Sequence, residues 1–109
     1  MSLNPSFTYN AVLTNIVDAD TVDLVVDLGL RISMRMRVRM YGINAPEMNT
    51  PGGKAAKTAL ANRVPLGSPV VVRTFKNPTD KYGRWLASIE HKQVDLGSWL
   101  VANGHALSN

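Results

Sequence analysis

The chain has 109 residues, of which 45% are hydrophobic and 18% are charged. A chain of this length can bury one modest core, so we expect a single domain over residues 1–109, with residues 1–8 as a flexible lead-in. It contains no cysteine, which excludes a disulfide framework and a thiolate metal site. No apolar run approaches the roughly 20 residues that span a bilayer, and no leader-like segment opens the chain. We therefore expect no membrane contact, and the sequence leaves the compartment open while slightly favouring the cytoplasm.

Basic residues outnumber acidic ones, twelve to eight, which gives a net charge of +4 and a pI near 9.8. Such a balance on a small domain favours an anionic partner, most often nucleic acid. The alternative interpretation is that the charge only keeps a small protein soluble. Clustering bears on the choice, because four of the seven arginines lie between positions 31 and 39.

Hydrophobic periodicity and turn residues predict seven elements. In chain order these are strands over 9–17, 21–27 and 31–40, a helix over 54–64, strands over 69–75 and 85–90, and a helix over 95–103. Residues 49–53, with one proline and two glycines, are expected to form a loop. A mainly β chain with two short helices (α+β) and five strands, one helix following the third strand, predicts an OB-type barrel.

The third predicted strand alternates strictly between apolar and polar residues. Its apolar positions are Ile32, Met34, Met36, Val38 and Met40, and its other positions are Arg31, Ser33, Arg35, Arg37 and Arg39. Because side chains on a strand alternate faces, one face is predicted to be greasy and the other cationic. The methionines are expected to fill the core. The arginines form either a nucleic-acid track or a solvated face, and we favour the solvated face for all but Arg39.

Two groups of residues between the predicted strands could hold a metal ion or activate water. Asp18 and Asp20 stand at i and i+2, where an extended segment places both carboxylates on one face, as a hard cation such as Ca²⁺ requires. The alternative is that they only cap a strand junction. Asn44-Ala45-Pro46-Glu47 follows the arginine strand, and Glu47 could act as a general base. Its alternative is a simple turn that ends a strand.

A third group, Asp80-Lys81-Tyr82-Gly83-Arg84, places an arginine just before the fifth strand. Two arginines from different strands can neutralise the charge that develops on a phosphoryl group. Taken alone, this segment is more typical of a solvated hairpin.

Taken together, the three groups resemble the staphylococcal nuclease (thermonuclease) family. The resemblance is carried by D-A-D-T, R-M-Y-G-I-N-A-P-E and D-K-Y-G-R in this order, and it covers roughly residues 16–106. It implies the five-stranded OB barrel of that family and a Ca²⁺-dependent phosphodiesterase that cleaves DNA and RNA with little sequence preference. Single-stranded nucleic acid is the expected partner, and the cleavage is expected to leave 3′-phosphate ends.

The resemblance also implies a role for each matching position. Asp20, Asn44 and the Ala45 carbonyl would bind Ca²⁺, with Asp18 behind them; Arg39, Glu47 and Arg84 would be catalytic; Lys81 and Tyr82 would lie along the substrate phosphates. Two departures qualify this picture. The family usually carries Asp where this chain has Asn44, so a weaker metal site is expected. The chain also stops at Asn109, where well-known members continue into a final helix.

The departures keep alternative functions open. The first alternative is a catalytically weak or inactive OB-fold module that binds nucleic acid, and the second is an interaction domain without nucleic-acid affinity. A binder has no use for Asp20 or Glu47, which favours the enzyme. His91 and His105 lack the spacing of metal partners and are expected at the surface. Trp85 and Trp99 are expected to pack in the core.

Overall fold

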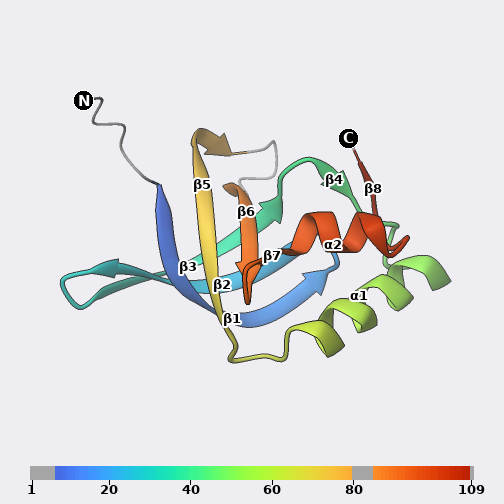
Figure 1. Cartoon of the computed structure of the whole chain (residues 1–109), viewed down its shortest axis with the longest axis horizontal. Helices are drawn as coiled ribbons and strands as arrows, with labels where there is room; N and C mark the ends of the chain where they lie inside the picture. The colour runs from blue at the N-terminus through green and yellow to red at the C-terminus, as the bar shows by residue number, and fades with distance from the viewer. Residues whose placement is uncertain (1–6, 80–84, 109) are drawn as a thin grey trace.

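The computed structural model describes residues 7–79 and 85–108, without the side chains of 75–79. The long strands are β1 (Thr8–Asp18), β2 (Thr21–Gly29), β3 (Ile32–Met40), β5 (Pro69–Thr79) and β6 (Trp85–His91), and the short ones are β4 (Ile43–Asn44), β7 (Val94–Asp95) and β8 (Leu107–Ser108). The helices are α1 (Pro51–Arg63) and α2 (Leu96–Ala102). In Figure 1 both helices lie at one end of the molecule, and the β2–β3 hairpin projects from the other end.

The five long strands close into a barrel. β1, β2 and β3 form an antiparallel meander, β1 also pairs with β5, and β5 pairs with β6. Closure comes from a short parallel ladder between β3 and β6, where Val38–Met40 face Trp85–Ala87. The predicted five-stranded OB-type barrel is therefore confirmed. Among the described residues, the outer edge of β3 before Val38 pairs with no other strand.

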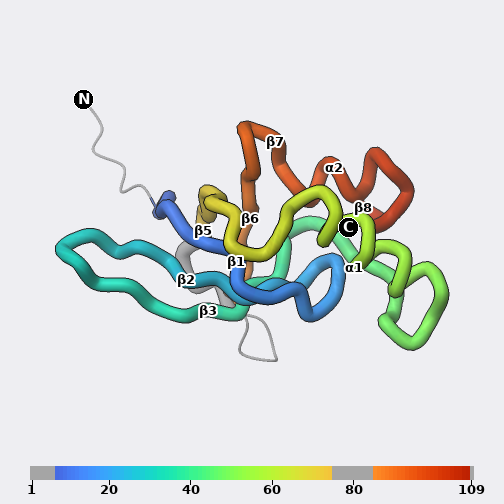
Figure 2. The backbone as a smooth tube through the Cα atoms, turned by 90° about the horizontal axis from the view of Figure 1, so that it is seen from below, coloured from blue at the N-terminus to red at the C-terminus, as the bar shows by residue number. Residues whose placement is uncertain are grey.

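The core fills the barrel and continues under the two helices. Both tryptophans pack against it, as expected. Its largest fully buried side chains are Leu24, Met40, Leu60, Ile89 and Leu100. Leu60 comes from α1 and Leu100 from α2, so each helix covers part of the barrel with a few apolar side chains. Figure 2 shows the same division from below, with the helices and the hairpin at opposite ends. The described part of the chain contains no helix long and apolar enough to cross a membrane.

The first helix starts earlier than its sequence pattern suggested. Residues 51–53, expected in a loop, form its first turn, with Pro51 at the start and Thr50 as the cap. The Thr50 hydroxyl accepts a hydrogen bond from the Gly53 amide at 3.1 Å. Proline suits the first helical position, because its missing N–H has no intrahelical acceptor there. The prediction of a loop over 51–53 was wrong because it took proline and glycine only as breakers.

Two expectations about exposure were also wrong. Ile32 and Met34 are 55% and 45% exposed, so the apolar face of β3 is half-buried at Met36 and buried only at Val38 and Met40. The reason is the projection of the hairpin beyond the barrel, where no layer covers it. His91 was expected at the surface but is 5% exposed. Its Nδ1 lies 3.0 Å from Nη1 of Arg63, which gives the buried ring a polar partner.

Candidate active site

The turn between β1 and β2 holds the two aspartates. Asp18 is the last residue of β1, and Asp20 lies in the two-residue turn and is only 8% exposed. The Asp20 amide donates to Oδ1 of Asp18 at 3.2 Å, and the Thr21 hydroxyl donates to Oδ1 of Asp20 at 3.1 Å. The Asp20 carbonyl accepts from the Met40 amide at 2.8 Å. This last bond ties the turn to the end of β3, which carries the neighbouring arginine.

Arg39 joins the aspartate turn to the segment after β3. Its Nη2 lies 3.6 Å from Oδ2 of Asp20 and donates to the Ile43 carbonyl at 3.1 Å. The same nitrogen donates to Oδ1 of Asn44. Asp20 also accepts from the Ala45 amide at 2.9 Å through Oδ2. The Arg39 guanidinium therefore contacts two of the three predicted metal ligands, Asp20 and Asn44. The backbone amide of the remaining one, Ala45, is hydrogen-bonded to Asp20.

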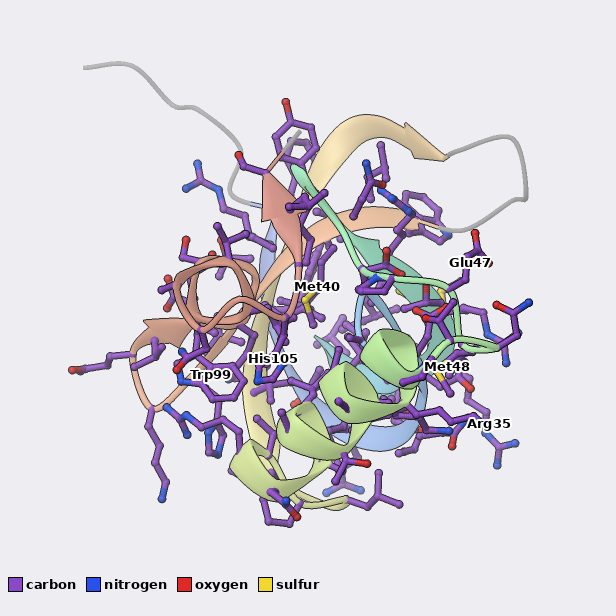
Figure 3. The ribbon with its side chains drawn as sticks, turned by 90° about the vertical axis from the view of Figure 1, so that its right-hand side faces the viewer. Arg35, Met40, Glu47, Met48, Trp99 and His105 are labelled. Atoms are coloured by element: carbon purple, nitrogen blue, oxygen red, sulfur yellow. The ribbon has the colours of Figure 1, made fainter. Side chains whose placement is uncertain are left out.

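Glu47 lies on the exposed loop between β4 and α1, as Figure 3 shows. Among the described residues its carboxylate has no hydrogen-bond or ion-pair partner. Its backbone is fixed, however, because the Glu47 carbonyl accepts from the Thr50 amide at 3.0 Å and from the Thr50 hydroxyl at 2.6 Å. Gly53 packs directly against it, since an added Cβ would stand 1.9 Å from the Glu47 oxygen. The loop thus presents a carboxylate with no partner among the described residues, from a backbone held by hydrogen bonds to Thr50.

The two aspartates differ in acidity. Burial, reinforced by the neighbouring Asp20, raises the pKa of Asp18 to about 6. Burial acts in the same direction on Asp20, but hydrogen bonds from Asp18 and the Ala45 amide, together with the charge of Arg39, hold the pKa of Asp20 below its usual range. Asp20 therefore stays ionised to a lower pH than Asp18, which suits a carboxylate that would have to bind a metal ion in its deprotonated form.

The predicted donor set consists of hard oxygens, which is the type that Ca²⁺ prefers. It comprises the Asp20 carboxylate, the side-chain oxygen of Asn44 and the Ala45 carbonyl. Only the first carries a formal charge, and the described residues contain no group of three or more His, Cys, Asp or Glu side chains that could hold a metal ion. The residues fit Ca²⁺ in kind, with fewer charges than a strong site has.

The third predicted group cannot be placed. Lys81, Tyr82 and Arg84 lie outside the described residues. Three further participants were not evident from the sequence pattern: the Ile43 carbonyl on Arg39, the Thr50 cap and the glycine at position 53. The Thr50 cap could have been found, because threonine directly before proline is a helix-start signal.

Comparison with known families adds an independent finding. A family model described as "Staphylococcal nuclease homologue" matches residues 37–109, about two thirds of the chain. The chain belongs to the staphylococcal nuclease homologue family. The matched region includes the Arg39 and Glu47 segments and both helices, whereas the aspartate turn precedes it.

Individual proteins that are similar to this chain are much longer than it is. The chain is 32% identical over 75 residues to the probable staphylococcal-like nuclease CAN2 of Oryza sativa subsp. japonica, covering 69% of this chain and 20% of that protein. It is 36% identical over 77 residues to Protein ParB of Escherichia coli, covering 71% of this chain and 39% of that protein. The chain thus spans well under half the length of these relatives.

Proposed function

We propose that this domain is a Ca²⁺-dependent nuclease that hydrolyses DNA or RNA, preferably single-stranded, with little sequence specificity. The observation that carries the proposal is the junction at Arg39. A cationic guanidinium for phosphate, an ionised buried carboxylate at Asp20 and the carboxylate of Glu47, which has no partner in the described part of the chain, come from three adjacent segments. Family membership and the name of the rice relative CAN2 support the same reading.

The chemistry assigned to these groups is hydrolysis of the bond between phosphorus and the 5′ oxygen. Glu47 takes a proton from water, the water oxygen attacks phosphorus, and the 5′ oxygen leaves and takes up a proton, so that a 3′-phosphate and a 5′-hydroxyl remain. Arg39 neutralises charge on the phosphoryl oxygens as the attack proceeds. To do so, the guanidinium has to exchange its hydrogen bond to Asn44 for the phosphate. Arg84, Lys81 and Tyr82 are proposed to contact the same substrate.

Bound Ca²⁺ would supply further positive charge next to the phosphate. Asp20, Asn44 and the Ala45 carbonyl would hold it, with Asp18 buttressing Asp20 through the backbone hydrogen bond. Asn44 contributes no formal charge, so we expect weaker Ca²⁺ binding than with a second aspartate.

The alternative function is a binding module without appreciable catalysis. One observation favours it: Arg39 is held on Asn44, which engages both a phosphate ligand and a metal ligand in contacts within the protein. In that case the domain would retain affinity for nucleic acid while losing the hydrolytic step.

A Ca²⁺ titration of Asn44→Asp tests the proposal. Cleavage of single-stranded DNA is followed against Ca²⁺ concentration for the wild type, Asn44→Asp and the control Asn49→Asp, which adds the same charge at an exposed position of the loop that follows β4. We expect Asn44→Asp to reach half-maximal rate at roughly tenfold lower Ca²⁺, and Asn49→Asp to behave like the wild type. Binding of the DNA without cleavage by any of the three proteins would refute the enzyme and leave the binding module.

A further inference from the structure

The outer part of the β2–β3 hairpin extends beyond the strands that pair with it in the barrel. The two strands pair from Thr21 opposite Arg39 out to Gly29 opposite Ile32. β1 accompanies β2 only as far as Val26, and β6 meets β3 only at Val38–Met40. The outer part of the hairpin therefore packs against no third strand among the described residues. Figures 1 and 2 both show it as a projecting ribbon along the long axis of the molecule, which measures 46 Å against 27 Å in the other directions.

The tip of the hairpin is unusual in conformation and in composition. Leu30 and Arg31 form the turn with φ angles of 56° and 65°, a conformation for which Asn-Gly is the common choice. Leu30 is 93% exposed, so it gains no burial in return for the strained backbone. Further exposed apolar side chains follow on the strands behind it at Leu28, Ile32 and Met34. Contacts among the described residues account for neither the exposed apolar side chains nor the strained turn.

The opposite face of the hairpin is cationic and leads back to the candidate active site. Arg35, Arg37 and Arg39 follow one another along this face of β3, and Arg39 ends it at Asp20. Arg37 is neutralised by Asp23, with its Nε 2.8 Å from Oδ1, but Arg31 and Arg35 have no ion pair among the described residues. A hollow of about 510 Å³ lies along this row, lined by Thr14, Asp23, Arg35 and Arg37 among others. The strand rise places Arg35 about 13 Å from Arg39 and the tip about 30 Å away.

In place of the solvated face favoured from the sequence, we propose that the β2–β3 hairpin is a nucleic-acid arm, in which Arg31 and Arg35 bind phosphates away from the cleaved bond and Leu30 inserts against bases. The inference rests on the proposed function, because it takes the polymer at Arg39 to be nucleic acid. A polymer that runs from Arg39 along β3 brings its further phosphates to Arg35 and Arg31, which have no ion pair among the described residues. The negative charges of the polymer then face positive charges of the hairpin. Apolar wedges flanked by arginine are the means by which several proteins unstack base steps.

A second copy of this chain fits the hairpin less well. Antiparallel pairing of two β3 edges about Met34 would place Arg31 of each copy opposite Arg37 of the other, and like charges that face each other directly destabilise a sheet. A membrane surface would have to accommodate Asp27, whose carboxylate lies at the tip and accepts from the Gly29 amide at 2.8 Å. Nucleic acid neither brings two arginines face to face nor has to bury Asp27. The arginines and the apolar tip act on different parts of the same ligand.

Fluorescence anisotropy with a labelled 30-nucleotide single strand tests the arm. Measurements in chelator, which stops the proposed cleavage, compare the wild type with Arg31→Ala/Arg35→Ala and with Leu30→Ser, at several salt concentrations. We expect the double variant to bind at least tenfold more weakly, with the slope of log K against log salt reduced by about 1.4, which is two phosphate contacts at about 0.7 each. Leu30→Ser should bind several-fold more weakly with an unchanged slope, because base contact releases no counterions.

Two matched controls and one further variant separate the arm from general effects. Arg73→Ala and Leu66→Ser remove an exposed arginine and an exposed leucine elsewhere, and both should bind like the wild type. Leu30→Asn/Arg31→Gly relieves the positive φ angles of the tip, so it should fold with an equal or higher Tm and still lose affinity. Retained wild-type affinity in this well-folded variant would overturn the arm.

The remaining outcomes distinguish the arm from its alternatives and from the proposed function. Equal affinity and salt slope in all hairpin variants would overturn the arm. So would unchanged DNA binding accompanied by loss of binding to anionic phosphatidylglycerol vesicles, or by loss of a concentration-dependent dimer. Cleavage of a dinucleotide, too short to reach Arg35, should be the same in hairpin variants and wild type. If the wild type binds the 30-mer through the arm but cleaves neither substrate in Ca²⁺, the nuclease proposal fails and the arm stands.

Discussion

The two ends of the β2–β3 ribbon have the same alternating sequence and opposite environments. At the barrel end, Val38 and Met40 are almost fully buried and Arg39 is hydrogen-bonded to the segment that follows. At the outer end, Ile32 and Met34 are about half exposed, and the tip leucine at position 30 is 93% exposed. Strand periodicity assigns residues to faces, but whether a face is buried depends on a covering layer. Among the described residues, only the barrel end lies inside the closed barrel, where β2 pairs with β1 and β3 pairs with β6.

The largest expected difference between the two ends is in stability. Leu24→Ala removes a side chain that is 1% exposed and should lower the free energy of unfolding by about 2–5 kcal/mol. Leu30→Ala changes the same residue type six positions further along the hairpin and should stay within about 0.5 kcal/mol of the wild type. Urea denaturation measures both. A loss above about 1 kcal/mol for Leu30→Ala would mean that the tip is packed against other parts of the domain.

The next effect concerns the close packing behind Glu47. An alanine Cβ at position 53 would stand 1.9 Å from the Glu47 carbonyl oxygen, whereas at Gly52 it would meet only Pro46 carbons at 3.6 Å. We expect Gly53→Ala to cost about 1–3 kcal/mol, and to slow cleavage by about 100-fold because the loop has to move. Gly52→Ala should keep both properties. Tm and initial cleavage rates measure the pair, and equal behaviour of the two variants would contradict the account of a fixed loop.

The smallest expected effect is a pH dependence of stability that comes from His91, which was predicted at the surface but is buried. Burial, together with the charges of Arg63 and Lys92, lowers the pKa of His91 below its ordinary value of about 6.5. The unfolded chain therefore binds a proton more readily than the folded one. Above about pH 6.5, His91 is neutral in both states and does not reduce the free energy of unfolding. Below that pH the free energy of unfolding falls, until the pH has passed through the lowered pKa of the folded state.

His91→Gln keeps a polar partner for Arg63 without a titrating ring, so its stability should change less between pH 7 and pH 5 than that of the wild type. Thermal unfolding at a series of pH values measures the difference. Parallel profiles of the two proteins would mean that His91 is not protonated more easily on unfolding.

The sequence predicted the fold well because its signals are local. Strand alternation, the turn residues and the motif order were sufficient for an OB-type barrel, and family membership is confirmed by comparison. Other features depend on contacts between distant residues. The burial of His91 requires Arg63 beside it, and the role of Gly53 appears only when α1 lies on the Glu47 turn. The Arg39 contact to Asn44 likewise follows from the turn geometry.

The site assignments themselves stay predictions. Asp18, Asp20, Arg39, Asn44 and Ala45 lie together in hydrogen-bonded contact, and Glu47 is on the adjoining loop. That proximity supports the assigned roles, and substitutions read out by cleavage and Ca²⁺ dependence test them. The segment with Arg84 has to be tested in the same way.

The most direct test of the central claim is the initial rate of single-stranded DNA cleavage in Ca²⁺ and in chelator, for wild type, Glu47→Gln and the control Glu90→Gln. Glu90 is exposed on β6, so its substitution removes a carboxylate without touching the site. We predict Ca²⁺-dependent cleavage by the wild type and by Glu90→Gln, and at least a 100-fold lower rate for Glu47→Gln with unchanged DNA binding. Equal rates for Glu47→Gln and the wild type, or wild-type cleavage that persists in chelator, would contradict the account.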